Sequence, residues 1–350
     1  MPSSLPIPAF DFFCGAGGLT RGLIDAGFRV LAGFDFDPGC RETYEHNNPG
    51  ARFVECDIRT LTFERLRGLS SEYDFREMLF AGCAPCQPFS QQTKGSRRCH
   101  DATVLGSFAR LVETTRPGYV LMENVPGIAR VKGNSTFRRF LRTLEDLSYQ
   151  YDYGVIDAKH HGVPQNRRRL ILIAARGHRP RLPEKNYGTG RSPYITVRRA
   201  ISHFPPVRAG ETHPDIPNHT ASSLTPLNLD RIRHTPHDGG DRRSWPRRLR
   251  LECHTGDYEG HTDVYGRMSW DAPAPTLTGR CHSLSNGRYG HPTQDRAITF
   301  REAAALQSFP DEYIFFSSNR HIARQIGNAV PVRLAEALGR QILSLCVETF

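Results

Sequence analysis

Two cysteines, Cys83 and Cys86, stand three residues apart in the stretch GCAPCQPFS, residues 82–90. This spacing occurs in structural zinc sites and in thiol–disulfide enzymes. A zinc site needs a second pair of ligands two to four residues apart, whereas the nearest Cys and His candidates are adjacent residues, at 99–100 and 160–161. A thioredoxin-like pair should stand at the start of a helix in a small domain, and this interpretation leaves the glycine-rich stretch at residues 15–18 and the basic part of the chain unexplained. A third interpretation uses Cys86 alone, as a thiol that a loop presents to an electrophilic carbon.

A thiol nucleophile of this kind needs an acid to assist it, and Glu123 is the candidate. It follows an apolar run in GYVLMEN, residues 118–124, and its apolar flanks favour a carboxyl group that takes part in proton transfer. An ordinary acid in an ion pair at the end of a strand would show the same pattern. Periodicity alone does not separate these two interpretations.

A glycine-rich turn lies near the start of the chain, in FDFFCGAGGLTRGLIDAGFRVLAGFD, residues 10–35. The pattern predicts a strand, a turn, a helix and a second strand that ends at Asp35. Glycines let the backbone approach a ligand, the helix start offers free N–H groups, and an acid about 20 residues further on binds ribose hydroxyls, which predicts an adenosine-type cofactor. NAD fits poorly, because Gly17 and Gly18 are adjacent and Thr20 stands where a third small residue belongs. Close packing of the helix on the strand would also need glycines.

The elements that position these residues follow from a repeated pattern. From residue 9 to about 176, helix-like segments separate the apolar runs AFDFF, RVLAGFD, EMLFAGC, GYVLMEN and RRLILIAA. Alternating strands and helices predict βαβ units and a largely parallel sheet. Ligands of such sheets bind beyond the carboxyl ends of the strands, where the glycine turn, Asp35, Cys86 and Glu123 all stand.

The sequence changes character after residue 177. From about 178 to 262 it is rich in Pro, Gly, His and Arg and has little apolar periodicity, which indicates a loop-rich module. Helical patterns return at TFREAAALQSF and VPVRLAEALGRQILSL. We therefore expect an α/β catalytic and cofactor-binding domain over residues 1–177, completed by residues 295–350, and a second, smaller loop-rich domain over residues 178–294.

Charge and composition narrow the class of partner. The 350 residues carry a formal net charge of +10, and the uneven placement of the basic residues favours a polyphosphate partner such as nucleic acid. A merely soluble basic surface is the alternative. Nine scattered cysteines do not suggest a disulfide framework, and the sequence contains neither a secretory segment nor an apolar run long enough to span a membrane. We expect a cytoplasmic protein, in the bacterial cell or with its nucleoid, that does not associate with membranes.

Eight short segments extend through nearly the whole chain: DFFCGAGGL, GFDFDPGC, ECDIRTL, PCQPFS, MENVPG, QNRRRLILIA, RMSWDAPAPTLT and RQIGNAVPV. Together, and in this order, they resemble the motifs of the cytosine-C5 DNA methyltransferase family, of the bacterial type associated with restriction–modification systems. The resemblance implies a Rossmann-like, S-adenosylmethionine-dependent methyltransferase fold with an added target-recognition domain, and double-stranded DNA as substrate.

The resemblance implies a covalent mechanism on a base that has left the helix. The thiolate of Cys86 adds to carbon 6 of cytosine while Glu123 protonates or hydrogen-bonds ring nitrogen 3, and carbon 5 then takes the methyl group. An arginine pair holds the carbonyl oxygen of the base, although a basic strand edge would give the same string. Cys83 receives no role, and a Cys83→Ala variant is expected to stay active. The implied catalytic residues are Cys86, Gln87, Glu123, Asn124, Arg167 and Arg169.

The resemblance also implies a binding site for the methyl donor. Residues 13–19 should line the methionine and adenosine, residues 57–58 should contact the adenine, and residues 328–330 should close the pocket. Asp35 departs from the family, which usually has glutamate there, so we expect altered affinity. The implied cofactor residues are Phe13, Gly15, Ala16, Gly17, Gly18, Leu19, Asp35, Phe36, Asp57, Ile58, Pro85, Asn328 and Val330.

DNA contacts are expected from the loop after Cys86 and from the Arg-rich part of the loop-rich domain. Most of the arginines should contact phosphates or be solvated, and a few are expected to read guanine. The implied DNA-binding residues are Ser90, Lys94, Arg231, Arg233, Arg242, Arg243, Arg247 and Arg248.

Three alternatives remain at this level. The same chemistry could act on transfer RNA, and the long Arg-rich insert favours DNA. A catalytically silent DNA-binding relative is opposed by the intact catalytic residues, and a NAD enzyme by the adjacent glycines. We expect a monomer that needs no metal.

Overall fold

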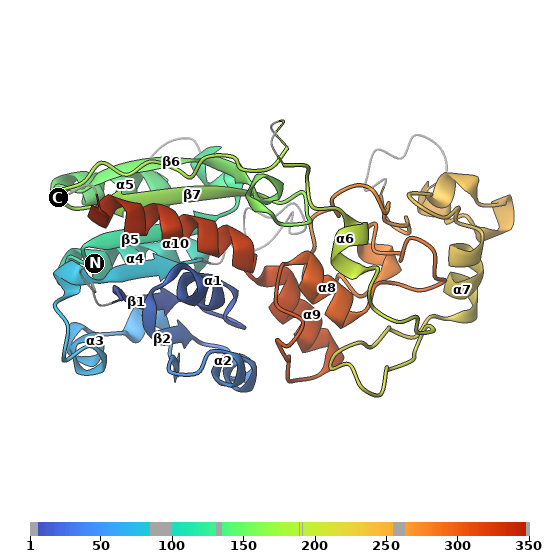
Figure 1. Cartoon of the computed structure of the whole chain (residues 1–350), viewed down its shortest axis with the longest axis horizontal. Helices are drawn as coiled ribbons and strands as arrows, with labels where there is room; N and C mark the ends of the chain where they lie inside the picture. Colours follow the sequence, from blue (N-terminus) through green and yellow to red (C-terminus); the bar gives the residue numbers. More distant parts are fainter. Residues whose placement is uncertain are drawn as a thin grey trace. The chain divides into compact units, whose positions relative to one another are not determined.

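The computed structural model describes residues 6–84, 100–130, 135–188, 190, 192–254 and 263–347 (Figure 1). The chain forms two compact units. Unit 1 consists of Met1–His161, Arg168–Lys185 and Val330–Phe350, and unit 2 consists of Gly162–Arg167 and Asn186–Ala329. Their positions relative to one another are not determined.

Unit 1 is built on a seven-stranded sheet in the order β3-β2-β1-β4-β5-β7-β6. The first five strands in this order run parallel, and β7 is antiparallel to both of its neighbours. The expected mostly parallel α/β sheet is thereby confirmed. The strands are β1 (Pro8–Phe12), β2 (Arg29–Asp35), β3 (Arg52–Glu55), β4 (Leu79–Gly82), β5 (Tyr119–Asn124), β6 (Gln150–Asp157) and β7 (Arg168–Ala175).

An aromatic core lies on one face of the sheet. Phe10 and Phe12 are two residues apart in β1, so their side chains share a face. There they meet the rings of Phe34, Phe80 and Phe108, and the Phe12 and Phe34 rings stack with their centroids 4.9 Å apart. All five side chains are buried. The core therefore fixes the positions of β1, β2 and β4, the strands from which the loops of the site begin.

The helices of unit 1 are α1 (Gly18–Ala26), α2 (Arg41–Asn47), α3 (Phe63–Leu69), α4 (His100–Thr115), α5 (Thr136–Asp146) and α10 (Val332–Val347). The C-terminal helix α10 packs along α1, far from it in sequence. Gly22 permits this close approach, because a Cβ there would collide with the Cβ of Ala335 and the carbonyl oxygen of Val332. The C-terminal helix therefore completes unit 1.

Unit 2 contains short elements: α6 (Val197–Ile201), α7 (Pro226–Arg233), α8 (Phe300–Leu306), α9 (Asn319–Asn328) and several 3-10 turns. The expected boundaries differ from the observed division, because residues 295–329 lie in unit 2, where α8 packs against α6 and α9. Residues 162–167 also belong to unit 2. In the described part of the chain, no helix is both long and apolar enough to cross a membrane.

Candidate active site

The carboxyl ends of four neighbouring strands bring the predicted residues of unit 1 together. Asp35 ends β2, the glycine-rich turn follows β1, Cys83 follows β4, and Glu123 lies one residue before the end of β5. These strands are adjacent and parallel in the order β2-β1-β4-β5, so their carboxyl ends share one edge of the sheet. Pro85, Cys86, Gln87, Ser90 and Lys94 lie outside the described residues.

Glu123 is a buried carboxylate, 3% exposed, that contacts two side chains. Its Oε1 lies 2.9 Å from Nε of Arg169, and its Oε2 accepts a hydrogen bond from Sγ of Cys83 at 2.7 Å. The antiparallel register pairs Glu123 with Ile171, so Arg169, two residues before Ile171, points to the same face. The sheet thus assembles the acid with one of the two predicted arginines and also with Cys83, to which the sequence assigned no role.

Asn124 ties the end of β5 to the chain that leads toward Cys86. Its side-chain amide donates to the carbonyl oxygen of Ala84 at 3.1 Å, and its Oδ1 accepts from the N–H of Val125 at 2.7 Å. The backbone at Cys83 is also fixed, because its N–H donates to the carbonyl oxygen of Phe12 at 3.2 Å. The segment that follows β4 is therefore held at residues 83 and 84 by both neighbouring strands.

Arg167 differs from its expected place as a clamp on the base. It belongs to unit 2, is 2% exposed, and donates to the carbonyl oxygens of Leu277, Gly327 and Ala329 at 3.0, 3.2 and 3.1 Å. Its guanidinium thus braces the backbone at Leu277, Gly327 and Ala329 inside unit 2. Of the predicted arginine pair, only Arg169 contacts the acid among the described residues.

Gln165 is a buried residue that sequence reasoning passed over. Its amide donates to the carbonyl oxygen of Leu306 and to Oε1 of Gln307, and its Oε1 accepts from the N–H of Leu277. The signal was present, because Gln165 opens the QNRRR segment. Gln165 and Arg167 together join the QNRRR segment to the backbone at Leu277, Leu306, Gly327 and Ala329.

The glycine-rich turn adopts left-handed backbone conformations, which favour glycine. Gly15 and Gly17 have φ values of 50° and 87°, and Phe13 has a φ of 64°, which is rare for a residue with a side chain. The N–H groups of Phe13 and Cys14 donate to the carbonyl oxygen of Phe34 at 2.7 and 3.1 Å. A Cβ built on Gly15 meets nothing within 4 Å, so the turn faces open space there.

Asp35 and Phe36 provide the features that an adenosine needs. Oδ2 of Asp35 accepts from the N–H of Gly15 and Oδ1 from the N–H of Asp37, both at 2.9 Å, so the carboxylate is held beside the turn. Burial raises the pKa of Asp35, and these two N–H donors oppose the rise. The Phe36 ring is 72% exposed and offers a flat apolar surface to a purine. The residues present therefore fit S-adenosylmethionine.

The other expected cofactor residues differ in burial: some are buried, one caps a turn, and one is exposed. Ala16, Gly18 and Leu19 are buried at the start of α1, so they face the interior of the unit. The carboxylate of Asp57 caps the turn η2 (Ile58–Thr60) and pairs with Arg59. The side chains of Ile58 and Val330 are buried, whereas Asn328 is exposed at the end of α9 in unit 2.

Arg231 is not placed as a DNA contact, because its side chain is inside unit 2. It is 6% exposed, donates from Nε to the carbonyl oxygen of Leu249 at 3.0 Å, and lies over the rings of Trp245 and Tyr265. The other arginines of the predicted set differ in exposure. Arg242 is half-buried, and the exposed members are Arg233, Arg243, Arg247 and Arg248.

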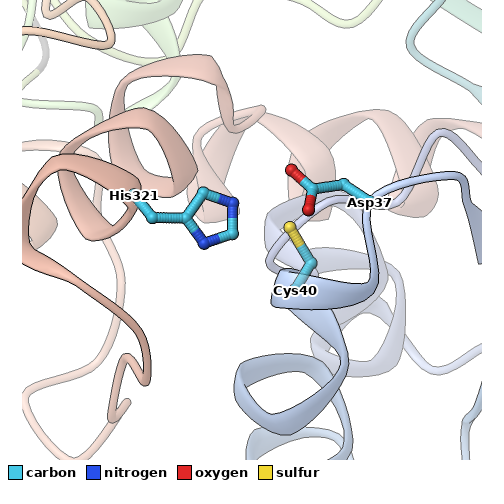
Figure 2. A group of neighbouring side chains, drawn as sticks. All are labelled: Asp37, Cys40 and His321. Atoms are coloured by element: carbon cyan, nitrogen blue, oxygen red, sulfur yellow. The ribbon is translucent and has the colours of Figure 1, made fainter.

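Figure 2 draws Asp37 and Cys40 at the turn η1 (Pro38–Cys40) of unit 1, together with His321 on α9 of unit 2. The two residues of unit 1 offer two ligand atoms, fewer than the three or four protein ligands of a zinc site. Within the described residues, neither unit taken alone holds three such groups close together. The cysteines that the structure describes form no disulfide bond with one another.

Comparisons with known proteins agree with this arrangement. Residues 7–344 match the family model of the C-5 cytosine-specific DNA methylase. The Type II methylase M.HgiDII of Herpetosiphon aurantiacus is 41% identical over 95% of this chain and 94% of its own, and the Type II methyltransferase M1.HphI of Haemophilus parahaemolyticus is 33% identical over 96% and 86%. An Escherichia coli prophage protein described as a DNA modification methyltransferase shares the fold, with a TM-score of 0.76 at 23% identity over 97% of this chain and 99% of its own. The chain therefore belongs to the C-5 cytosine-specific DNA methylase family.

Proposed function

We propose that this enzyme transfers a methyl group from S-adenosylmethionine to carbon 5 of cytosine in a specific double-stranded DNA sequence, through a covalent adduct with Cys86. The observation that carries the proposal is the buried contact of Glu123 with Arg169, 2.9 Å apart. It lies at the edge of the sheet where β4 leads toward Cys86. Relatives named Type II methylase and methyltransferase support a target of the restriction–modification kind.

The chemistry requires an acid beside the nucleophile, because carbon 5 of cytosine is a poor nucleophile. Addition of the Cys86 thiolate to carbon 6 breaks the carbon 5–carbon 6 double bond, and Glu123 stabilises the electron density that would otherwise build up at ring nitrogen 3. When bound, S-adenosylmethionine supplies a methyl group attached to a cationic sulfur, and carbon 5 accepts this methyl group. Loss of the carbon-5 proton then restores the double bond and releases the thiolate of Cys86.

Arg169 suits the role of orienting the acid. A guanidinium is planar, stays charged and presents donors in a fixed direction, so it holds a carboxylate in one plane. Its Nε contacts Glu123, which leaves the other nitrogens of the fork for further partners, and Nη1 donates to the carbonyl oxygen of Arg168 at 2.8 Å. In this proposal, the remaining donor capacity of Arg169 serves the carbonyl oxygen of the base.

The donor site is proposed at the glycine-rich turn. Main-chain groups of residues 13–17 bind the methionine part, Asp35 accepts from the ribose hydroxyls, and the exposed ring of Phe36 stacks on the adenine. The open space at Gly15, the carboxylate held by backbone N–H groups and the exposed ring support this assignment.

Unit 2 is proposed to recognise the DNA. A base inside a duplex is out of reach of any thiol, so the target cytosine must leave the helix, at a cost of about a few kcal/mol. The exposed arginines of residues 233–248 suit phosphates, which give affinity, and base edges in the major groove, which give specificity.

The proposal is tested by the product. Wild type and Cys86→Ser are expressed in a host that lacks its own cytosine methylation, and the nucleosides of purified DNA and of purified transfer RNA are separated by mass spectrometry. We expect 5-methyldeoxycytidine in DNA from the wild type only, with bisulfite sequencing locating it in one recurring sequence. If methylcytidine were found only in transfer RNA, the substrate would be transfer RNA and not DNA. Methylated DNA in the Cys86→Ser host would overturn the role of Cys86, and no methylation anywhere would indicate a silent DNA-binding protein.

A further inference from the structure

Cys83 is the second partner of the buried carboxylate. Its Sγ lies 2.7 Å from Oε2 of Glu123, while Arg169 contacts Oε1. Each carboxylate oxygen therefore has its own side-chain donor, and the plane of the carboxyl group is fixed from both sides. We propose that Cys83 is a positioning residue for the catalytic acid: its thiol donates to Oε2 and holds Glu123 in the orientation that the base requires. The inference rests on the proposed role of Glu123.

The sheet makes this contact a property of the scaffold. The parallel register of β4 and β5 pairs Gly82 with Met122, so Cys83, the first residue after β4, comes beside Glu123, the next residue of β5. The N–H of Cys83 donates to Phe12, on the strand at the other side of β4. Glu123 is on a regular strand, and Cys83 is anchored by this backbone hydrogen bond directly after one, which holds both side chains more precisely than a free loop would. Cys86 itself lies three residues further on, so Cys83 links the acid to the chain that presents the nucleophile.

The chemistry of a thiol suits this position. A thiol is a weak donor, and Cys behaves in other respects as a small apolar side chain. It can orient a carboxylate inside an apolar edge of the sheet without adding a charge that would compete with Arg169. Removal of this donor would leave Oε2 buried without its thiol partner, which costs free energy and lets the carboxyl group turn. A misplacement of about 1 Å in an active site can cost on the order of 100-fold in rate.

The test compares Cys83→Ala, which removes the donor, with Cys83→Ser, which keeps one. The matched control is Cys346→Ala, because Cys346 contacts Tyr119 at the opposite end of β5. Single-turnover methyl transfer to the target duplex is measured from pH 6 to 9, with the affinities for duplex and for S-adenosylmethionine. We expect Cys83→Ala to be slower by about 10- to 100-fold, with a displaced pH profile and affinities within about threefold of wild type. Cys83→Ser should recover most of the rate, and Cys346→Ala should match wild type.

Two outcomes would overturn the inference. One is a Cys83→Ala enzyme with the wild-type rate and pH profile, as the sequence alone had led us to expect. The other is an equal loss of rate in Cys83→Ala and Cys83→Ser, accompanied by weaker binding, which would mark Cys83 as a packing residue. Should the alanine variant fail to fold, Cys83→Val fills the space without a donor. A wild-type enzyme that transfers no methyl group would instead refute the proposed function, so the two failures are distinguishable.

Discussion

Asp11 is a fully buried carboxyl group in β1, one strand away from Asp35. Its Oδ2 accepts a hydrogen bond from Oγ1 of Thr20 at 2.7 Å, and Thr20 in turn lies 3.0 Å from the hydroxyl group of Tyr44. Burial raises the pKa of Asp11 to about 7; the hydrogen bond from Thr20 opposes the rise, and the charge of Asp35 adds to it. At neutral pH, the sheet therefore contains a carboxyl group that titrates directly behind the cofactor turn.

This pKa makes the stability of unit 1 depend on pH. A raised pKa means that the folded state prefers the protonated carboxyl, so its contribution is complete below the usual value of 3.8 and is lost as the pH rises through about 7. Asp11→Asn removes this loss, so the free energy of unfolding of the variant should gain on wild type between pH 5 and pH 8, by about 2–3 kcal/mol. Urea unfolding at both values measures it. Asp25→Asn, a partly exposed carboxyl of α1 paired with Arg21, is the control. An equal difference between Asp11→Asn and wild type at both pH values would contradict the account.

A residue of the site was predictable from the sequence only if the strand that positions it was also predictable. Glu123, Asp35 and the glycine turn stand at the ends of apolar runs, and the sheet brings those ends to one edge. The contact of Cys83 with Glu123 depends on the register of β4 against β5, which a sequence does not state. Arg167 and Arg169 are identical in type and two residues apart, yet one enters unit 2 and the other contacts the acid. Their difference follows from where the chain passes between the units.

At the scale of elements, the buried strands were predicted and the edge strands were missed. The five apolar runs correspond to β1, β2, β4, β5 and β7. β3 has only four residues, and β6 lies at the edge with several exposed side chains, so neither forms a continuous apolar run. The helical pattern of α8 was also predicted, but periodicity says only that a helix has a buried face, not which unit buries it.

The packing of α1 on α10 gives a prediction with a close control. Gly22→Ala inserts a methyl group against backbone and side-chain atoms of α10, and overpacking of this kind costs about 1–3 kcal/mol. Gly68→Ala adds the same group to α3, where nothing lies within 4 Å, so it should stabilise by about 0.5–1 kcal/mol through helix propensity. Thermal unfolding of both variants measures the two effects. If Gly22→Ala were as stable as Gly68→Ala, α10 would not pack on α1 as described.

The positive charge of the protein is divided between the surface and the interior. Arg296 forms a buried pair with Glu302, with two contacts of 2.7 Å. Burial alone would raise the pKa of Glu302. The hydrogen bonds and the charge of Arg296 outweigh this effect and hold the pKa of Glu302 below its usual value. The composition does not separate buried from exposed arginines, because arginines on loops follow no periodicity that would show whether their side chains face the interior or the solvent. The fully or nearly buried arginines of unit 2 are Arg167, Arg231, Arg267, Arg296 and Arg301.

The exposed arginines predict how DNA affinity depends on salt. Combining Arg247→Gln with Arg248→Gln should weaken binding of the target duplex and of unrelated duplexes alike, and should reduce the slope of log K against log salt by about 1 for each phosphate that is no longer neutralised. Arg340→Gln is the control, because this exposed arginine lies on α10 of unit 1, outside the predicted DNA-binding residues. Titrations at several salt concentrations measure the slopes. An unchanged slope in the double variant would remove these two residues from the DNA surface.

Cys86 is proposed to form the covalent bond to cytosine, and trapping this adduct on DNA shows whether it does. The target duplex, identified by bisulfite sequencing, is prepared with 5-fluorocytosine at the methylated position and incubated with S-adenosylmethionine and either wild type or Cys86→Ser. Fluorine at carbon 5 cannot leave as a proton does, so the wild type should remain bound to DNA on a denaturing gel, with the modified peptide containing Cys86. Cys86→Ser should form no adduct. A wild-type enzyme that methylates the ordinary duplex but leaves no adduct, or an adduct on another residue, would contradict the account.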